Sequence, residues 1–423
     1  MPKSIIFEDV YGMSNITSCR SCGHTGFYNF LDLGKQPLAN SYLSEGNLQD
    51  PEPLHSLNAM VCSQCFLAQL DHNVNAEHIF NEDYAYFSSF SDTWLDHCRA
   101  YALKMMSLLQ LSHDSLVIEV ASNDGYMLKN FVAAGIPVLG VEPSANTARA
   151  AEEIGVSTRV DFFNAATGRA LAAEGLQADL IAAKNVMAHV PDLADFVAGF
   201  KAALKPQGCI TVEFPHLLRQ IEQLQFDTIY HEHYSYLSLL AVEYAFQEAG
   251  LRVFDVEELP THGGSLRIFG CHDDAPFGAT DALQRVRQME DAAGLSTKAA
   301  YADFARRVEE CRSSFVAFLL QARSEGKRIA AYGAAAKGNT FLNYAGADAN
   351  DITFVVDRSP HKQGKFLPGS RIPIMAPEAI LKYKPDYVLV LPWNLWDEIT
   401  EQMISVREWG GKFVRAVPVI QFG

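Results

Sequence analysis

The segment that decides the fold is Leu116-Val117-Ile118-Glu119-Val120-Ala121-Ser122-Asn123-Asp124-Gly125. Its β-branched and apolar residues give way to small and turn-forming residues, and apolar side chains at helical spacing follow in residues 126–131. This pattern predicts a strand, a loop and a helix. In such a unit the backbone amides at the start of the helix face any ligand that lies over the end of the strand.

Similar units follow along the middle of the chain. Strands are predicted at residues 137–143, 180–185 and 209–214, with helices at 94–111, around 165–173 and at 192–204. The alternation of strands and helices predicts a parallel sheet covered on both faces. The second strand ends at an acid, Glu142. A carboxylate at that position in a doubly wound fold accepts both hydroxyls of a ribose, so a nucleotide-type ligand is expected.

The first loop lacks the GxGxxG pattern of Rossmann oxidoreductases. Glu119 inside the first strand, together with Glu142, instead resembles the signature of class I methyltransferases that bind S-adenosylmethionine. A nucleotide fold that serves another adenosine ligand is the alternative. The resemblance implies a cofactor site made of Glu119, Ser122, Asn123 and Gly125 at the methionine end, Glu142 and Pro143 at the ribose, Asp161 and Phe162 beside adenine, and Asn185 near the sulfonium.

Four cysteines form two CxxC pairs, Cys19 with Cys22 and Cys62 with Cys65. Two such pairs can supply the all-thiolate tetrahedral shell of a structural zinc ion, which would provide much of the folding energy of a small domain. Redox cycling of a dithiol is the alternative, but two pairs that bracket a loop favour metal. The other cysteines are scattered singly, as in proteins of a reducing compartment.

A cluster of titratable and aromatic residues spans Tyr230-His231-Glu232-His233-Tyr234-Ser235-Tyr236. Histidine titrates near neutral pH, and a tyrosine hydroxyl can donate to a developing oxyanion. The cluster therefore suits removal of a proton from carbon next to a carbonyl. The alternative is an aromatic strip whose histidines are merely satisfied by hydrogen bonds. A second aromatic and hydroxyl-rich segment, residues 82–91, could line a pocket.

The C-terminal part contains another strand, small-residue loop and helix start, over residues 326–340. Such a loop exposes backbone amides to a phosphate, and Lys337 adds a cation. Further strands are predicted at 352–357 and 387–391, and a mostly helical segment, 281–323, precedes the domain. The sequence lacks the Lys-Ser/Thr pair of a P-loop, so ATP hydrolysis is not expected. A tight turn that serves only packing is the alternative.

Residues 261–267 place paired glycines before a strand, which allows close backbone approach to a ligand. Arg267 is then a candidate partner for a diphosphate. A simple hairpin turn explains the same pattern equally well.

The CxxC pairs, the strand order, residues 185–192, Phe214-Pro215-His216 and residues 230–234 together resemble the sugar C-methyltransferases that act on dTDP-linked keto-deoxysugars. The resemblance covers nearly the whole chain. It implies an α/β protein with three domains around one cleft. These are a small N-terminal four-cysteine zinc domain (1–75), a central class I methyltransferase Rossmann-like domain (76–275) and a C-terminal Rossmann-like α/β domain that binds the nucleotide sugar (276–423).

The same resemblance implies methylation of the carbon next to the ketone, C3 of a 4-keto-6-deoxy sugar on dTDP, although GDP and UDP carriers remain open. His233 is the expected base, Tyr84 or Tyr86 and Tyr230 are expected to donate to substrate and enolate oxygens, and Glu232 to orient these groups. His189 is expected to assist or replace His233. The expected substrate-binding residues are His231, Gly264, Arg267, Lys337 and Asn339.

Composition excludes several classes of partner. The net charge of -16 over 423 residues argues against nucleic acid and anionic lipid as partners. The chain shows neither a long uncharged apolar run nor the apolar core of a secretory signal, so a cytoplasmic protein is expected.

The sequence is also compatible with three rival functions. A zinc hydrolase could use His231 and His233, which on a strand would point to one face, but the HExxH spacing is absent. An O-methyltransferase that acts on a sugar hydroxyl and a non-catalytic nucleotide-sugar binder are the others.

Overall fold

The computed structural model describes residues 14–73 and 87–423, and the chain divides into two compact units. Unit 1 contains the residues up to Phe27, Cys62–His216 and Tyr234–Leu295. Unit 2 contains Tyr28–Val61, Leu217–His233 and Ser296–Gly423. Each unit is therefore assembled from segments that lie far apart in the sequence, and each has its own mixed sheet.

Unit 1 is built on a seven-stranded sheet. The strand order is β12 (Leu251–Leu259), β13 (Ser265–His272), β10 (Leu204–Pro215), β9 (Ala178–Lys184), β6 (Val117–Val120), β7 (Val138–Val141) and β8 (Thr158–Arg159). Strands β10, β9, β6, β7 and β8 pair in parallel, which confirms the predicted parallel sheet. Strand β13 is antiparallel to both of its neighbours, a direction that the sequence analysis did not predict.

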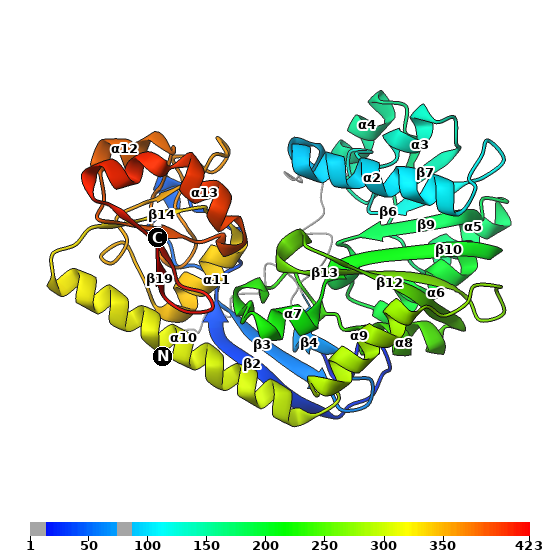
Figure 1. Ribbon diagram of the computed structural model, residues 1–423, viewed down its shortest axis with the longest axis horizontal. Helices are drawn as coiled ribbons and strands as arrows, with labels where there is room; N and C mark the ends of the chain where they lie inside the picture. The colour runs from blue at the N-terminus through cyan, green and yellow to red at the C-terminus, as the bar shows by residue number, and fades with distance from the viewer. Residues whose placement is uncertain (1–13, 74–86) are drawn as a thin grey trace, which may run out of the picture. The chain divides into compact units, whose positions relative to one another are not determined.

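Helices cover both faces of this sheet, as predicted (Figure 1). Alternate residues of β6 face opposite sides. Val117 packs in a cluster with α2 (Asp92–Leu108) and α3 (Lys129–Ala133), and Ile118 packs in a cluster with α6 (Leu193–Ala203) and α8 (Leu239–Glu248). The remaining helices of the unit are α4 (Ala145–Glu153), α5 (Ala165–Ala173) and α9 (Asp281–Ala292). A strand buried on both faces explains the continuous apolar runs in the sequence.

Short strands complete unit 1. Strand β1 (Ser14–Asn15) pairs antiparallel with β5 (His72–Asn73), and β4 (Ala68–Leu70) pairs antiparallel with β11 (Ser235–Tyr236). The two CxxC pairs belong to this part of the unit.

Unit 2 is built on a six-stranded sheet. The order is β16 (Ile374–Met375), β15 (Val355–Val356), β14 (Ile329–Tyr332), β17 (Tyr387–Val390), β18 (Lys412–Arg415) and β19 (Gln421–Phe422), and only β19 is antiparallel to its neighbour. The chain moves outward from β14 in one direction and then from β17 in the other. Ligands of open α/β sheets bind at such a switch point, beyond the carboxyl ends of the strands.

The helices of unit 2 are α7 (Leu217–Glu222), α10 (Lys298–Ser324), α11 (Ala336–Ala345), α12 (Glu378–Tyr383) and α13 (Trp396–Gln402). Strands β2 (Phe27–Gln36) and β3 (His55–Cys62) are neighbours in a further sheet. The strand, loop and helix predicted at residues 326–340 are β14, the loop 333–335 and α11, so that prediction is confirmed. Within the described ranges, no helix combines the length and the apolar character needed to cross a lipid bilayer.

Helices α5 and α6 approach each other closely because both carry glycine at the contact. A Cβ atom on Gly168 would lie 2.4 Å from the carbonyl oxygen of Gly199, and one on Gly199 would lie 2.6 Å from the carbonyl oxygen of Asn164. No side chain fits without a shift of backbone.

We therefore expect Gly168→Ala to lower the free energy of unfolding by about 1–3 kcal/mol, measured by urea denaturation. Gly278→Ala is the matched control, because a Cβ there meets nothing within 4 Å, and its effect should stay within about 0.5 kcal/mol. Equal stability of the two variants would contradict the close helix contact.

Candidate functional site

The four predicted metal ligands lie together. The Sγ atoms of Cys19, Cys22, Cys62 and Cys65 are all within 4.8 Å of one another. The closest pairs join the two CxxC motifs, Cys19 with Cys65 and Cys22 with Cys62, each at 3.5 Å. Gln69 Nε2 donates to Cys19 Sγ at 3.1 Å, and the backbone N of Gln64 donates to Cys62 Sγ at 3.4 Å. Such N–H donors stabilise thiolates, so the donor set fits a tetrahedral metal ion.

The pKa values of these thiols also agree with a cation-binding site. A hydrogen bond from Cys65 lowers the pKa of Cys19 to about 5, and the same bond raises the pKa of Cys65. Thiols this close cannot all ionise together without a compensating positive charge. A divalent ion would supply that charge.

The predicted ribose acid, Glu142, lies at the end of β7 and is buried. Its Oε2 accepts a hydrogen bond from Asn123 N at 2.9 Å, and its Oε1 accepts one from Ser144 N at 2.9 Å. Burial raises its pKa, although these amide donors oppose the shift. The carboxylate thus ties the loop after β6 to the end of β7, where Pro143 follows.

The loop after β6 has an unusual backbone. Ala121, Asn123 and Gly125 have φ values of 56°, 49° and 74°, in the left-handed region. Non-glycine residues rarely adopt this region, and strained residues cluster at functional sites. Ser122, between them, is fully buried. Contacts with the rest of the unit therefore hold this loop in a backbone conformation that its residues would rarely adopt by themselves.

Glu119 is a buried acid beneath this loop. Burial raises its pKa well above the ordinary value, and Lys184 acts in the opposite direction. The Tyr126 hydroxyl lies near enough to lower that pKa, yet among the described residues neither carboxylate oxygen has a partner with good hydrogen-bond geometry. A ligand that brings a cationic donor, such as the ammonium of a methionyl group, fits this acid.

Part of the predicted aromatic segment contacts the loop after β6. In the turn η2 (Ser88–Phe90), Ser88 N donates to Asn123 Oδ1 at 2.9 Å, and Ser89 N donates to Asp124 Oδ2 at 3.2 Å. Tyr84 and Tyr86, the predicted enolate partners, lie outside the described residues.

Other predicted residues of unit 1 also follow strand ends. Asp161 and Phe162 come after β8 and are exposed, and Thr167 Oγ1 donates to Asp161 Oδ2 at 3.3 Å. Asn185 follows β9, and His189 is the half-buried last residue of the turn η3 (Met187–His189). Because the carboxyl ends of parallel strands share one edge, these residues belong to the ligand edge of the sheet.

A buried charge network lies at the same edge. Lys184 Nζ lies 3.0 Å and Arg267 Nη2 lies 2.9 Å from Glu213 Oε2, and His97 Nε2 lies 2.9 Å from Glu213 Oε1. The Tyr101 ring centroid lies 3.8 Å from Lys184 Nζ. Burial alone would raise the pKa of Glu213, but Lys184, His97 and Arg267 hold it well below its ordinary value.

The structure gives Arg267 a different setting from the predicted one. Its guanidinium is buried and also donates to Glu257 at 2.7 Å, so protein carboxylates already occupy both terminal nitrogens. Burial therefore disfavours the predicted role in diphosphate binding. Gly264, with φ 116°, lies in the turn that joins the antiparallel strands β12 and β13, which agrees with the hairpin alternative.

In unit 2, hydrogen bonds define the predicted base. His233 Nδ1 lies 2.9 Å from the Thr228 carbonyl oxygen, which accepts a hydrogen bond and so places the ring proton on Nδ1. Nε2 is then the basic nitrogen, and it accepts a hydrogen bond from the Tyr230 hydroxyl at 2.8 Å. The two rings lie with centroids 4.0 Å apart.

The neighbours of His233 do not form the strand assumed for the hydrolase alternative. His233 N donates to Tyr230 O at 2.9 Å and closes a turn, so His231 and His233 do not share a strand face, and that assumption was wrong. His231 is buried, with its ring 6.0 Å from that of His55. Glu232 accepts from Asn40 Nδ2 at 2.7 Å, and burial raises its pKa.

Lys337 lies at the start of α11, at the switch point of the unit 2 sheet. Its half-buried side chain lies beside the Trp393 ring, with Nζ 5.0 Å from the ring centroid. Burial lowers the pKa of Lys337, whereas Asp227 opposes that shift. Trp393 Nε1 donates to Asp227 at 2.7 Å, and burial raises the pKa of Asp227 to about 6. Asn339 is buried and donates to the Ala39 carbonyl oxygen at 2.6 Å.

Four residues of these contact networks were not predicted from the sequence: His97, Glu213, Asp227 and Trp393. A usable signal for Glu213 was an acid within an otherwise apolar strand, because a buried charge needs partners. No comparable signal identified Asp227, since its partners come from distant segments.

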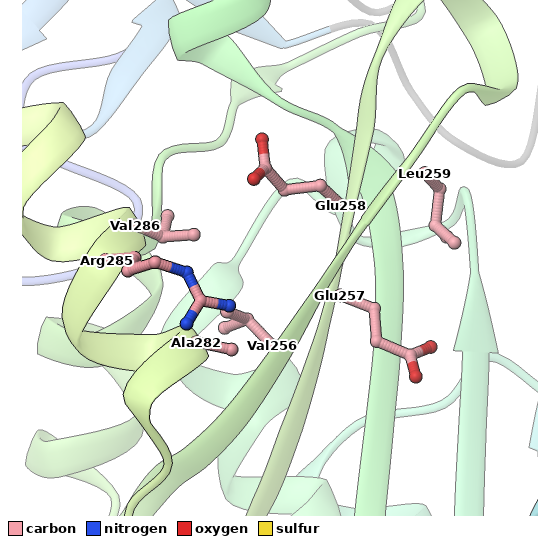
Figure 2. A pocket seen from close by; sticks show the side chains of 7 residues that line it. All are labelled: Val256, Glu257, Glu258, Leu259, Ala282, Arg285 and Val286. Atoms are coloured by element: carbon pink, nitrogen blue, oxygen red, sulfur yellow. The ribbon is translucent and has the colours of Figure 1, made fainter.

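A separate hollow of about 380 Å³ lies between β12 and α9. Figure 2 shows its lining, in which the Glu257 carboxylate points away from Arg285. It contains none of the predicted functional residues.

Comparison with known proteins defines the class. A family model described as "Methyltransferase domain" matches residues 96–256, and one described as "C-methyltransferase C-terminal domain" matches residues 260–418. A third, described as "Putative zinc binding domain", matches residues 19–80. With the fold described above, these matches define an S-adenosylmethionine-dependent methyltransferase of class I fold with an N-terminal four-cysteine domain.

The C-methyltransferase NovU of Streptomyces niveus is 35% identical over 403 residues, which cover 95% of this chain and 96% of that protein. The chain therefore belongs to the C-methyltransferase family.

Among solved structures, magnesium protoporphyrin IX methyltransferase of Synechocystis PCC 6803 with bound S-adenosylhomocysteine is 11% identical, with a TM-score of 0.34, over 42% of this chain and 83% of that chain. An S-adenosylmethionine-dependent methyltransferase of Clostridium acetobutylicum is 12% identical, with a TM-score of 0.35, over 42% and 92%.

The cysteine geometry gives a direct prediction. Purified protein should carry about one zinc ion per chain by elemental analysis, and Cys62→Ser should lose most of it because the tetrahedral shell is opened. Cys311→Ser is the control, since Cys311 Sγ lies in unit 2 and donates to Ala416 O. Retention of zinc by Cys62→Ser would contradict the assignment.

Proposed function

We propose that this C-methyltransferase acts on a nucleotide-linked keto-deoxysugar and methylates the carbon next to its ketone. By resemblance, the acceptor is C3 of a dTDP-linked 4-keto-6-deoxy sugar in the cytoplasm. The observation that carries the proposal is the hydrogen bonding of His233, which leaves Nε2 as a base beside a phenol.

Proton removal is the step assigned to unit 2. A hydrogen on carbon next to a ketone is acidic because the resulting carbanion delocalises onto oxygen. His233 Nε2 takes this proton, while the Thr228 carbonyl keeps the imidazole in the required tautomer. Tyr230 turns from Nε2 to the enolate oxygen, with Tyr84 or Tyr86 as a further donor, and Glu232 orients the groups. His189 is proposed to assist.

Recognition of the carrier is assigned to the switch point of the unit 2 sheet. Lys337 is a half-buried cation at the start of a helix, where backbone amides also favour an anion. Asp227, which accepts from Trp393 beside Lys337, immediately precedes Thr228, the residue that holds His233. The contacts thus support a diphosphate site close to the base. Asn339, His231 and Gly264 are the other proposed substrate residues.

The methyl group comes from S-adenosylmethionine, which supplies an electrophilic carbon. In unit 1, Glu119 and the loop from Ser122 to Gly125 are proposed to bind its methionine end, Glu142 and Pro143 its ribose, and Asp161 and Phe162 its adenine. The buried carboxyl group of Glu119 and the amide-bound carboxylate of Glu142 support this placement.

In the proposed division of labour, residues 1–75 hold a structural zinc ion, 76–275 bind the methyl donor and 276–423 bind the nucleotide sugar. The four-thiolate geometry supports zinc because this shell leaves no open position for catalysis.

The test uses labelled methyl donor and a small panel of keto-sugar nucleotides, with product mass and NMR. His233→Ala should lower turnover by about 10²–10⁴-fold, the usual contribution of a general base, while S-adenosylmethionine affinity stays within about twofold. His113→Ala, at an exposed loop position, is the control. Loss of donor affinity in His233→Ala, or a product methylated on oxygen, would contradict the proposal.

A further inference from the structure

His262 has no role in the site described so far, yet it meets a proposed cofactor residue. It is exposed in the turn between β12 and β13, and its Nε2 lies 3.1 Å from Asn185 Nδ2. Asn185 and His262 have φ values of 52° and 56°. Two strained residues from distant loops are thus joined side chain to side chain at the ligand edge of the sheet.

Both partners are also tied to one residue, Glu213. The backbone N of Asn185 donates to the Glu213 carbonyl oxygen at 2.8 Å. Thr261, which precedes His262, donates from Oγ1 to Glu213 Oε1 at 3.4 Å. The Trp94 ring lies 5.8 Å from the His262 ring and restricts its position. The contact between Asn185 and His262 therefore closes a ring of contacts through Glu213, whose backbone carbonyl binds Asn185 and whose carboxylate binds Thr261.

The side-chain amide oxygen of Asn185 accepts no hydrogen bond from the described residues. This Oδ1 atom is buried. A buried acceptor without a partner is costly, so a ligand that presents positive charge to it would be favoured. The sulfonium of S-adenosylmethionine carries such a charge, whereas the thioether of S-adenosylhomocysteine does not.

We propose that His262 is a positioning residue for methyl transfer. Its imidazole accepts the Asn185 Nδ2 hydrogen bond and so turns Oδ1 toward the sulfonium of S-adenosylmethionine. This inference rests on the proposed function and on the placement of Asn185 near the sulfonium that the methyltransferase resemblance implies. It assigns to the pair a preference for the charged donor over the neutral product.

The test compares the affinities of S-adenosylmethionine and S-adenosylhomocysteine by calorimetry, with no sugar present. His262→Gly should weaken S-adenosylmethionine binding about tenfold, the worth of one hydrogen bond, and change S-adenosylhomocysteine binding by no more than about twofold. Glycine accepts the left-handed backbone, so the unfolding temperature should stay equal or rise. His262→Gln keeps an acceptor near the same place and should retain the wild-type ratio of affinities.

The proposal would be overturned if His262→Gly weakened the binding of both ligands equally and so left the ratio of affinities unchanged. It would also be overturned if His262→Gln failed to retain the wild-type ratio. A purely structural role predicts that stability and both affinities fall together. This binding experiment contains no sugar. If the protein failed to methylate any sugar nucleotide, the proposed acceptor would be wrong, but the comparison of the two affinities could still be interpreted.

Discussion

The buried carboxylate of Glu213 is the constraint on which the ligand edge of unit 1 depends. Lys184, Arg267 and His97 reach it from β9, β13 and α2. Removal of one partner from such a cluster typically costs about 3–5 kcal/mol, because a charge is left buried and uncompensated. The net contribution of the whole cluster to the free energy of unfolding is small, because burial of the charges offsets their attraction. Its main effect is to fix the positions of the groups that it joins. It fixes the ends of these elements, from which Asn185 and the turn at Thr261 project.

In unit 2, a smaller set of contacts has a comparable effect. The Thr228 carbonyl selects the tautomer of His233, and Asp227 beside it accepts from Trp393, the ring against which Lys337 lies. Two consecutive residues therefore act on this region: Asp227 fixes the ring beside the half-buried Lys337, and Thr228 fixes the basic nitrogen of His233. This arrangement suits a substrate with an acidic C–H bond and an anionic carrier.

Much of the fold could be predicted from the sequence. Apolar runs that end at small residues identified β6, β7, β9 and β10 because these strands are buried on both faces. The spacing of the CxxC pairs identified the metal site. The sequence located Glu142 at the end of a strand, but its hydrogen bonds from Asn123 N and Ser144 N were found only in the structure.

The remaining features depend on contacts between distant segments, which local patterns do not encode. Arg267 was predicted to bind a diphosphate because its partners could not be recognised in the sequence. These partners, Glu213 and Glu257, lie on the neighbouring strands β10 and β12. The hydrolase alternative placed His231 and His233 on a strand, where they would share one face, but the hydrogen bond from His233 N to Tyr230 O closes a turn there. Asn185 and His262 likewise meet because the pairing of the strands brings their two loops together, which neither loop sequence indicates.

Solvent exchange tests the central claim, that a carbon-bound proton is removed before the methyl group is transferred. A dTDP-linked 4-keto-6-deoxy sugar is incubated with the protein in D₂O without methyl donor, and the C3 proton is followed by NMR. The account predicts that the C3 signal disappears faster with the protein than without it. A C3 signal that persists at the uncatalysed rate, under conditions where added S-adenosylmethionine gives methylated product, would contradict it.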